Sequence, residues 1–237
     1  MGKKQMSSFQ PEPLDLVIAI IATVGLPILS WYLYTSIGAL PVLIIYYGIF
    51  CIGVRKWRYG NTGYEIEDSN IIGQFKGYVT IPFIIALVAQ IGLIIDSWIV
   101  VERVTNSTLV GFLGTLLLWA PINAFSEQLS WLYVFESFSE FWDEKTKRWL
   151  GIAIGVLLYV TYIGLIHALF WGRFLLGSAS VSPFTEIFFV LQFVVSLCYL
   201  IIYRQSRSMW PIGIIHFLLN FTSVLFSGYS MLPYLIR

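Results

Sequence analysis

The sequence predicts an all-α fold, a polytopic bundle of about seven transmembrane helices, and three observations support this prediction. Of the 237 residues, 58% are hydrophobic and only 11% are charged, and the mean hydropathy is +0.80. A soluble domain has about 45–50% apolar and about 25% charged residues, so this chain has too few polar groups to coat a water-facing surface. Apolar runs of spanning length recur along the chain, and basic residues gather in alternate loops between them.

The spans follow from the length of the apolar runs, because a helix needs about 20 apolar residues to cross the hydrocarbon. We expect one integral-membrane domain over 1–237, with spans at roughly 14–34, 36–54, 79–100, 108–135, 149–172, 183–203 and 208–228. The fourth run is long, so we expect that helix to tilt strongly or to run past the interface. The first run is followed by no small-residue cleavage site, so we expect no cleavable signal peptide.

The basic residues predict the orientation of these spans. If the loops alternate between two sides, 11 of the 14 basic residues fall on the side of the N-terminus, and the other three are Arg103, Arg173 and Arg237. This asymmetry favours a cytoplasmic N-terminus in a multi-pass protein of the cytoplasmic (plasma) membrane of a prokaryote. The net charge of +1 gives no reason to expect a nucleic-acid partner.

Two loops on the basic side carry expectations of their own. We expect the loop 55–77, which contains two glycine turn signals, to project into the cytoplasm. The connection 136–149 mixes aromatic and charged residues. It has two interpretations: a solvated turn with Trp142 and Trp149 as interfacial anchors, or a short amphipathic helix lying in the headgroups.

Polar residues inside the spans are few, and Glu127 is the most informative. It stands in the apolar run INAFSEQLSWLYVF, and an ionised carboxylate in hydrocarbon costs several kcal/mol, so it marks a candidate functional site. Helical spacing of four places Asn123, Glu127 and Trp131 on one face of the fourth span. The same spacing pairs His216 with Asn220 on the seventh span, and the fifth carries His167, the other histidine of the chain.

This set of residues supports two hydrolytic chemistries. In the first, Glu127 is a general base for a water that His167 helps to position, while His216 and Asn220 donate hydrogen bonds to the oxyanion; no cofactor is needed. In the second, Glu127, His167 and His216 bind zinc in a site with an open position for water. Both end in hydrolysis of an acyl bond, and we expect a peptide bond.

At these residues the chain resembles the CPBP family. That family comprises CAAX prenyl endopeptidases of the Ras-converting type, their bacterial and archaeal relatives, and bacteriocin-immunity proteins, also called Abi proteins. Its pattern is Glu-Glu-x-x-x-Arg on one span, aromatic-x-x-x-His on the next and His-x-x-x-Asn or Asp on a later one. EQLSWLYVF places Glu127 on the leading Glu, GLIHALFW places His167, and HFLLN satisfies the third motif. The resemblance covers about 120–225, inside the motif-bearing core 108–228.

The resemblance implies an intramembrane glutamate-dependent endopeptidase, or a metalloendopeptidase where zinc is bound. Glu127 and His167 would activate water, and His216 with Asn220 would form the oxyanion hole. Its substrates would be membrane-associated peptides or proteins, with lipidation at a C-terminal cysteine left open. Because His167 lies far along its span, the fifth helix must begin below the interface, or tilt, to bring it to the others.

The sequence departs from the family pattern at two positions. Gln128 replaces the second Glu and Leu132 replaces the Arg, so neither charge of that pair is left without its partner. We expect Gln128, Trp131 and Asn123 to be supporting residues. Two alternatives stay open: a catalytically silent relative that binds a peptide as an immunity or scaffold protein, and a small transporter that relays protons through its intramembrane glutamate and histidines.

Overall fold

A computed structural model describes residues 9–65, 72–100, 108–171, 183–228 and 230–235. Within these residues every regular element is helical, which confirms the predicted all-α class. The elements are α1 (Pro13–Ser36), α2 (Ala39–Leu43), η1 (Ile44–Val54), α3 (Arg55–Tyr59), η2 (Ile72–Phe75), η3 (Gly77–Val79), α4 (Thr80–Val100), α5 (Leu109–Gly114), η4 (Thr115–Trp119), α6 (Ala120–Ser139), α7 (Lys145–Ile166), η5 (His167–Trp171), α9 (Phe184–Ser206), α10 (Trp210–Ser227) and η6 (Leu232–Tyr234).

Six helical stretches of the described chain are long and apolar enough to cross a membrane, and Trp210–Phe226 is a shorter apolar helix. Together they match the seven predicted spans. The second span continues through α3 to Tyr59, and the fourth is a 31-residue stretch, Leu109–Ser139, in which α5, η4 and α6 follow one another. The exposed faces of these helices carry large apolar side chains such as Ile84, Leu117 and Phe193, as expected for contact with lipid.

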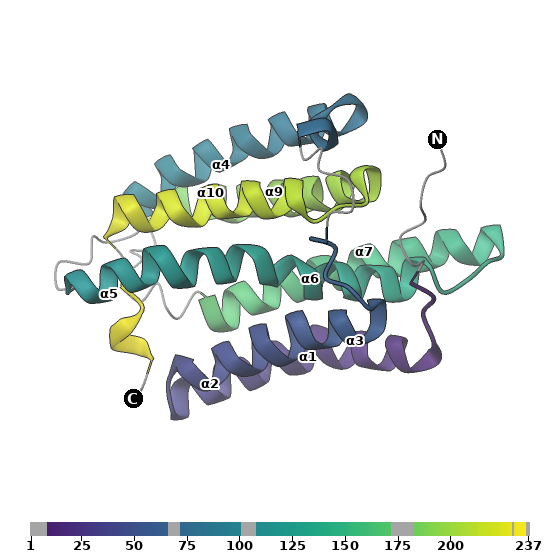
Figure 1. Cartoon of the computed structure of the whole chain (residues 1–237), viewed down its shortest axis with the longest axis horizontal. Coiled ribbons are helices and arrows are strands. Elements are labelled where there is room, and N and C mark those ends of the chain that lie inside the picture. The colour runs from purple at the N-terminus through teal and green to yellow at the C-terminus, as the bar shows by residue number, and fades with distance from the viewer. Residues whose placement is uncertain (1–8, 66–71, 101–107, 172–182, 229, 236–237) are drawn as a thin grey trace.

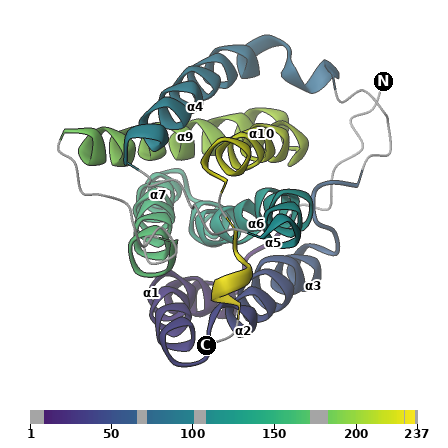
Figure 2. The ribbon, with the colours of Figure 1, turned by 90° about the vertical axis from the view of Figure 1, so that its left-hand side faces the viewer.

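Helix α6 lies at the centre of the bundle (Figure 2). It packs against α7, α10, α1 and η1, while α4 and α9 lie side by side as an outer pair. Almost every residue of α6 from Asn123 to Ser139 is buried. The polar residues that the sequence places on this helix therefore face other helices and not lipid.

Two glycines allow α7 to approach α6 closely. A Cβ at Gly151 would lie 2.5 Å from the carbonyl oxygen of Phe138, and one at Gly155 would lie 2.7 Å from the carbonyl oxygen of Phe135. Gly-x-x-x-Gly spacing is a common device for bringing helix backbones together inside a membrane. The pair therefore fixes the distance between α6 and α7.

Helix α7 also begins beyond the ends of its neighbours (Figure 1). It starts at Lys145, and residues 143–150 are all exposed. Because α7 begins this early, His167 reaches the middle of the bundle although it lies far along the helix.

The end of the bundle at which α3 and α9 finish and α7 begins is here called the basic end (Figure 1). All nine described basic residues lie at this end: Arg55, Lys56, Arg58, Lys76, Lys145, Lys147, Arg148, Arg204 and Arg207. One buried and one partly buried ion pair tie its helices together. Arg55 contacts Glu136 at 3.1 Å, and Arg58 makes a bidentate contact with Asp15 at 2.8 and 2.7 Å.

The loop 55–77 does not simply project, because α3 extends the helix and residues 60–65 pack back against α10 and α6, through Trp210 and Phe125; 66–71 lie outside the described residues. In the connection 136–149, α6 runs to Ser139 and α7 begins at Lys145, so a turn joins them and no separate amphipathic helix forms.

Candidate functional site

The candidate site is built on one stretch of α6, near the middle of the bundle. Asn123, Glu127, Gln128 and Trp131 are each at most 3% exposed. Burial of these groups is costly unless each finds a partner. The partners come from α3–α4 loop residues and from η1, α7, α9 and α10.

Glu127 and His216 face each other across the interface between α6 and α10. Oε2 of Glu127 lies 3.9 Å from Nε2 of His216, and both side chains are almost wholly buried. This distance is too long for a direct hydrogen bond but suits one water molecule that bonds to both atoms. The two groups predicted from different spans thus meet.

Gln128 determines which nitrogen of His216 carries the proton. The amide nitrogen of Gln128 donates to the carbonyl oxygen of Ala124 and to the hydroxyl of Tyr64, so its oxygen faces His216. That oxygen lies 3.1 Å from Nδ1 of His216. An amide oxygen only accepts, so Nδ1 is the donor and Nε2 of the neutral ring turns a lone pair toward Glu127.

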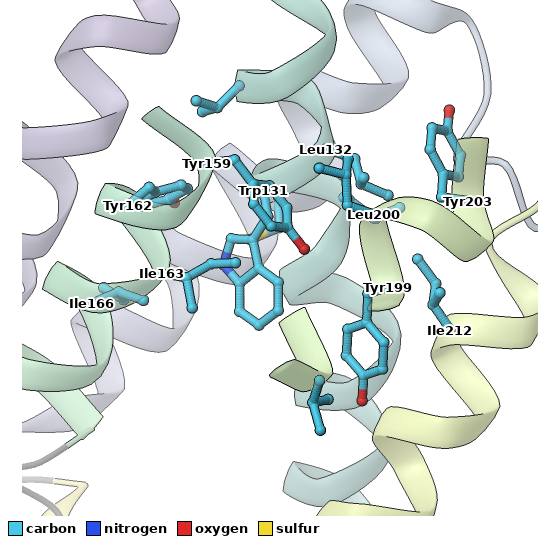
Figure 3. Close-up of a cluster of buried hydrophobic side chains, with 14 of the residues drawn as sticks. Trp131, Leu132, Tyr159, Tyr162, Ile163, Ile166, Tyr199, Leu200, Tyr203 and Ile212 are labelled. Carbon is cyan, nitrogen blue, oxygen red and sulfur yellow. The ribbon is translucent and has the colours of Figure 1, made fainter. Parts of the chain in front are cut away.

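Trp131 contacts both histidines. The centroid of its ring lies 5.8 Å from that of His216 and 6.0 Å from that of His167. Figure 3 shows its indole between the α7 side chains Tyr162 and Ile163 and the α9 side chain Tyr199. The indole nitrogen donates to Tyr46 at 3.2 Å, so the ring is fixed at both its apolar and its polar edge.

His167 is held by its own helix. It is the first residue of η5, a π-helical segment, and Nδ1 lies 2.8 Å from the carbonyl oxygen of Ile163. A carbonyl oxygen accepts, so this nitrogen also carries a proton and Nε2 is unprotonated in the neutral ring. The two histidines therefore have the same tautomer. The π-helical turn at His167 is of a kind that occurs often at functional sites.

Asn220 belongs to a second group of polar side chains, next to the first. Its amide nitrogen donates to the side-chain oxygen of Asn123, whose own nitrogen donates to the hydroxyl of Tyr47 at 2.6 Å. Asn220 and His216 lie one turn apart on α10, as Asn123 and Glu127 do on α6. The two helices thus pair through an amide contact and an acid–imidazole contact.

Buried tyrosines, and Cys51, interact electrostatically with Glu127. Four buried tyrosines lie within range of its charge: Tyr46, Tyr47, Tyr162 and Tyr199. None of them is singled out by the sequence, because an aromatic residue in a span is usually apolar packing. Tyr64 was missed for another reason: its loop is polar, and only the fold brings it to Gln128.

The predicted zinc ligands are not gathered into one group. Among the residues that the structure describes, no three histidine, cysteine, aspartate or glutamate side chains lie close enough together to hold a metal ion. His216 faces Glu127, and His167 contacts Trp131. Zinc therefore enters no step of the chemistry below.

The comparisons with known proteins add no identification. A scan against protein-family models, a search of curated proteins and a search of solved structures each gave no match. The resemblance to the CPBP family therefore stays a prediction.

Proposed function

We propose that this chain is an intramembrane hydrolase that cleaves a peptide bond with Glu127 as general base, as in a CPBP-type endopeptidase. The observation that supports the proposal is the facing pair of Glu127 and His216. Its acid and imidazole are 3.9 Å apart, and the Nε2 lone pair is directed by Gln128. A buried acid beside a histidine of fixed tautomer is what activation of water requires.

A water bound between these two groups donates one hydrogen to Oε2 of Glu127 and the other to Nε2 of His216. Its lone pairs then point away from both, toward a carbonyl carbon of the substrate. As the water oxygen bonds to that carbon, Glu127 takes the proton and the carbonyl oxygen becomes an oxyanion. Glu127 then passes the proton to the amide nitrogen as the C–N bond breaks, which leaves an acid and an amine.

The oxyanion requires a donor, and Asn220 is the best placed. An amide nitrogen carries two hydrogens, and the bond from Asn220 to Asn123 uses one of them. The other is available to a substrate oxygen beside the water. Relative to the roles expected from the resemblance, Asn220 keeps its role, His216 moves to the water, and His167 contacts Trp131 next to the pair.

The substrate class follows from the surroundings. The site lies among helices of spanning length, so a substrate must present its scissile bond at membrane depth. We propose a membrane-associated peptide or protein, cut at the depth of the candidate site, in the cytoplasmic membrane of a prokaryote. The resemblance to the CPBP family further suggests a substrate that carries a lipid on a C-terminal cysteine.

The test is cleavage of a peptide library by the purified chain in proteoliposomes, read by mass spectrometry. Glu127→Gln keeps the shape of the side chain but removes the base, and we expect kcat to fall by about 10²–10⁴-fold. Glu140→Gln, at the partly exposed end of α6, is the matched control and should cleave normally. Equal cleavage by the wild-type chain and Glu127→Gln would contradict the proposal.

The second candidate is a catalytically silent relative that binds a peptide. One observation favours it: Asn220 is paired with Asn123 and Gln128 with Tyr64, so several polar groups of the site already bond to each other. A binder keeps its affinity for a captured peptide in Glu127→Gln and releases no fragments in either form. An enzyme instead releases fragments only with Glu127 intact.

A further inference from the structure

The segment after α3 is a tight turn that holds itself in shape. Gly60 ends α3 with a φ of 72°, and Gly63 has a φ of 84°, which glycine adopts without strain. The carboxylate of Glu65 accepts from the backbone nitrogen of Thr62 at 2.9 Å and from that of Gly63 at 2.9 Å. Tyr64 is thereby held between two fixed residues.

The turn is anchored on the first residues of α10. The backbone nitrogen of Met209 donates to the carbonyl oxygen of Gly63 at 3.2 Å, and the indole nitrogen of Trp210 donates to that of Tyr64 at 2.9 Å. The Tyr64 ring makes edge contacts with the rings of Trp210 and Phe125. These contacts direct the hydroxyl of Tyr64 inward, between α10 and α6.

The space for that hydroxyl is made by the lack of a side chain at Gly213. A Cβ there would lie 2.8 Å from the Tyr64 hydroxyl and 2.8 Å from the ring of Phe125. At the far end of its ring, Tyr64 accepts a hydrogen bond of 2.5 Å from the amide nitrogen of Gln128. A loop residue thus contacts the group that orients His216.

We propose that Tyr64 is a positioning residue of the candidate site, acting through Gln128 to keep His216 in its Nδ1-protonated tautomer. Both hydrogens of the Gln128 amide are bonded, one to Ala124 and one to Tyr64. Rotating the amide would break both bonds, so its present orientation is favoured. Its oxygen then stays on Nδ1, and Nε2 stays open toward Glu127. This inference deepens the proposed function and rests on it for its catalytic meaning, but its structural part can be tested alone.

The experiment is ¹⁵N NMR of the full chain labelled at histidine, because the nitrogen shifts distinguish the two tautomers. The chain has only two histidines, so His167→Gln assigns the signals. We expect Tyr64→Phe to change the tautomer ratio of His216 by roughly fivefold, the equivalent of one neutral hydrogen bond. Gly213→Ala should act similarly by displacing the hydroxyl, and Gln128→Leu should give the largest change.

Tyr78→Phe is the matched control, because Tyr78 is 87% exposed at the same end of the bundle and should leave the spectrum unchanged. A His216 signal that stays wholly Nδ1-protonated in both Tyr64→Phe and Gly213→Ala would overturn the inference. If instead the tautomer shifts as expected while Glu127→Gln leaves peptide cleavage unaltered, the proposed function fails and the positioning role stands.

Discussion

Glu127 shows how a buried acid is accommodated in this protein. Its carboxyl group faces His216 on α10 and interacts electrostatically with the tyrosines of η1, Tyr162 on α7 and Tyr199 on α9. Burying an ionised carboxyl costs several kcal/mol, and the polar groups around Glu127 lower that cost.

Glu65 gives a prediction at the residue scale that depends on pH. Burial alone raises the pKa of this carboxyl, but hydrogen bonds from the backbone and hydroxyl of Thr62 outweigh that effect, so the pKa is lower than the usual 4.5. The turn is therefore fully stabilised above about pH 4.5 and loses that stabilisation as pH falls through the lowered pKa. Amide hydrogen exchange should show that the protection of Thr62 and Gly63 falls in this range.

Glu65→Gln serves as the control for that measurement. An uncharged amide at this position should give weak protection of the Thr62 and Gly63 amides at every pH. Protection in the unmodified chain that stays constant from pH 7 to pH 3 would show that the carboxylate does not hold the turn.

The sequence predicted part of the site at this scale. Glu127, His216, His167 and Asn220 stand out because polar residues are rare in its spans, and helical spacing gives their shared faces. Neither signal shows which groups bond to each other. The pairing of His216 with Glu127, and the contact of Tyr64 with Gln128, depend on how α10 and the α3–α4 loop pack against α6.

At the scale of elements, the contact between α6 and α7 positions Trp131 and His167. That contact depends on Gly155, where a Cβ would lie 2.7 Å from the backbone of Phe135. A backbone carbonyl cannot move aside as a flexible side chain can, so we expect Gly155→Ala to lower the free energy of unfolding by about 1–3 kcal/mol. Equilibrium unfolding in mixed micelles measures this change.

Gly164 on the same helix is the matched control. Nothing lies within 4 Å of a Cβ built there, so Gly164→Ala should be neutral or stabilise the helix by up to about 1 kcal/mol through helix propensity. If the two substitutions have equal effects, the close approach of α6 and α7 does not carry the stability assigned to it.

The helices themselves were largely predictable, because the length of an apolar run is a direct measure of a span. All seven predicted spans correspond to helices, with ends that differ by a few residues. Departures arise where side chains bond to other elements: the second span continues to Tyr59 because Arg55 and Tyr59 bond to Glu136 on α6. The π-helical start at His167 has no signal in a single sequence.

At the scale of the whole molecule, the asymmetry of charge predicts which end faces the cytoplasm. All described basic residues lie at one end of the bundle, as the loop count indicated. Lys147→Cys, at a residue 60% exposed at that end, should react with an impermeant maleimide only after the cells are opened. Leu232→Cys, 48% exposed at the other end, should react in intact cells.

The native cysteines do not interfere with this test, because Cys51 and Cys198 are both buried. Labelling of Lys147→Cys in intact cells, with Leu232→Cys protected, would reverse the orientation. The basic end, with the Tyr64 turn, would then face outward.

The central claim is that Glu127 and His216 act as one unit on a water, and a double-mutant cycle tests it most directly. Using a peptide cleaved by the wild-type chain, kcat/KM is measured for Glu127→Gln, His216→Gln and the double variant. Each single change should lower kcat/KM by about 10²–10⁴-fold. The kcat/KM of the double variant should be within about tenfold of that of the less active single variant. If the double loss equals the product of the single losses, the two residues act independently and the claim is contradicted.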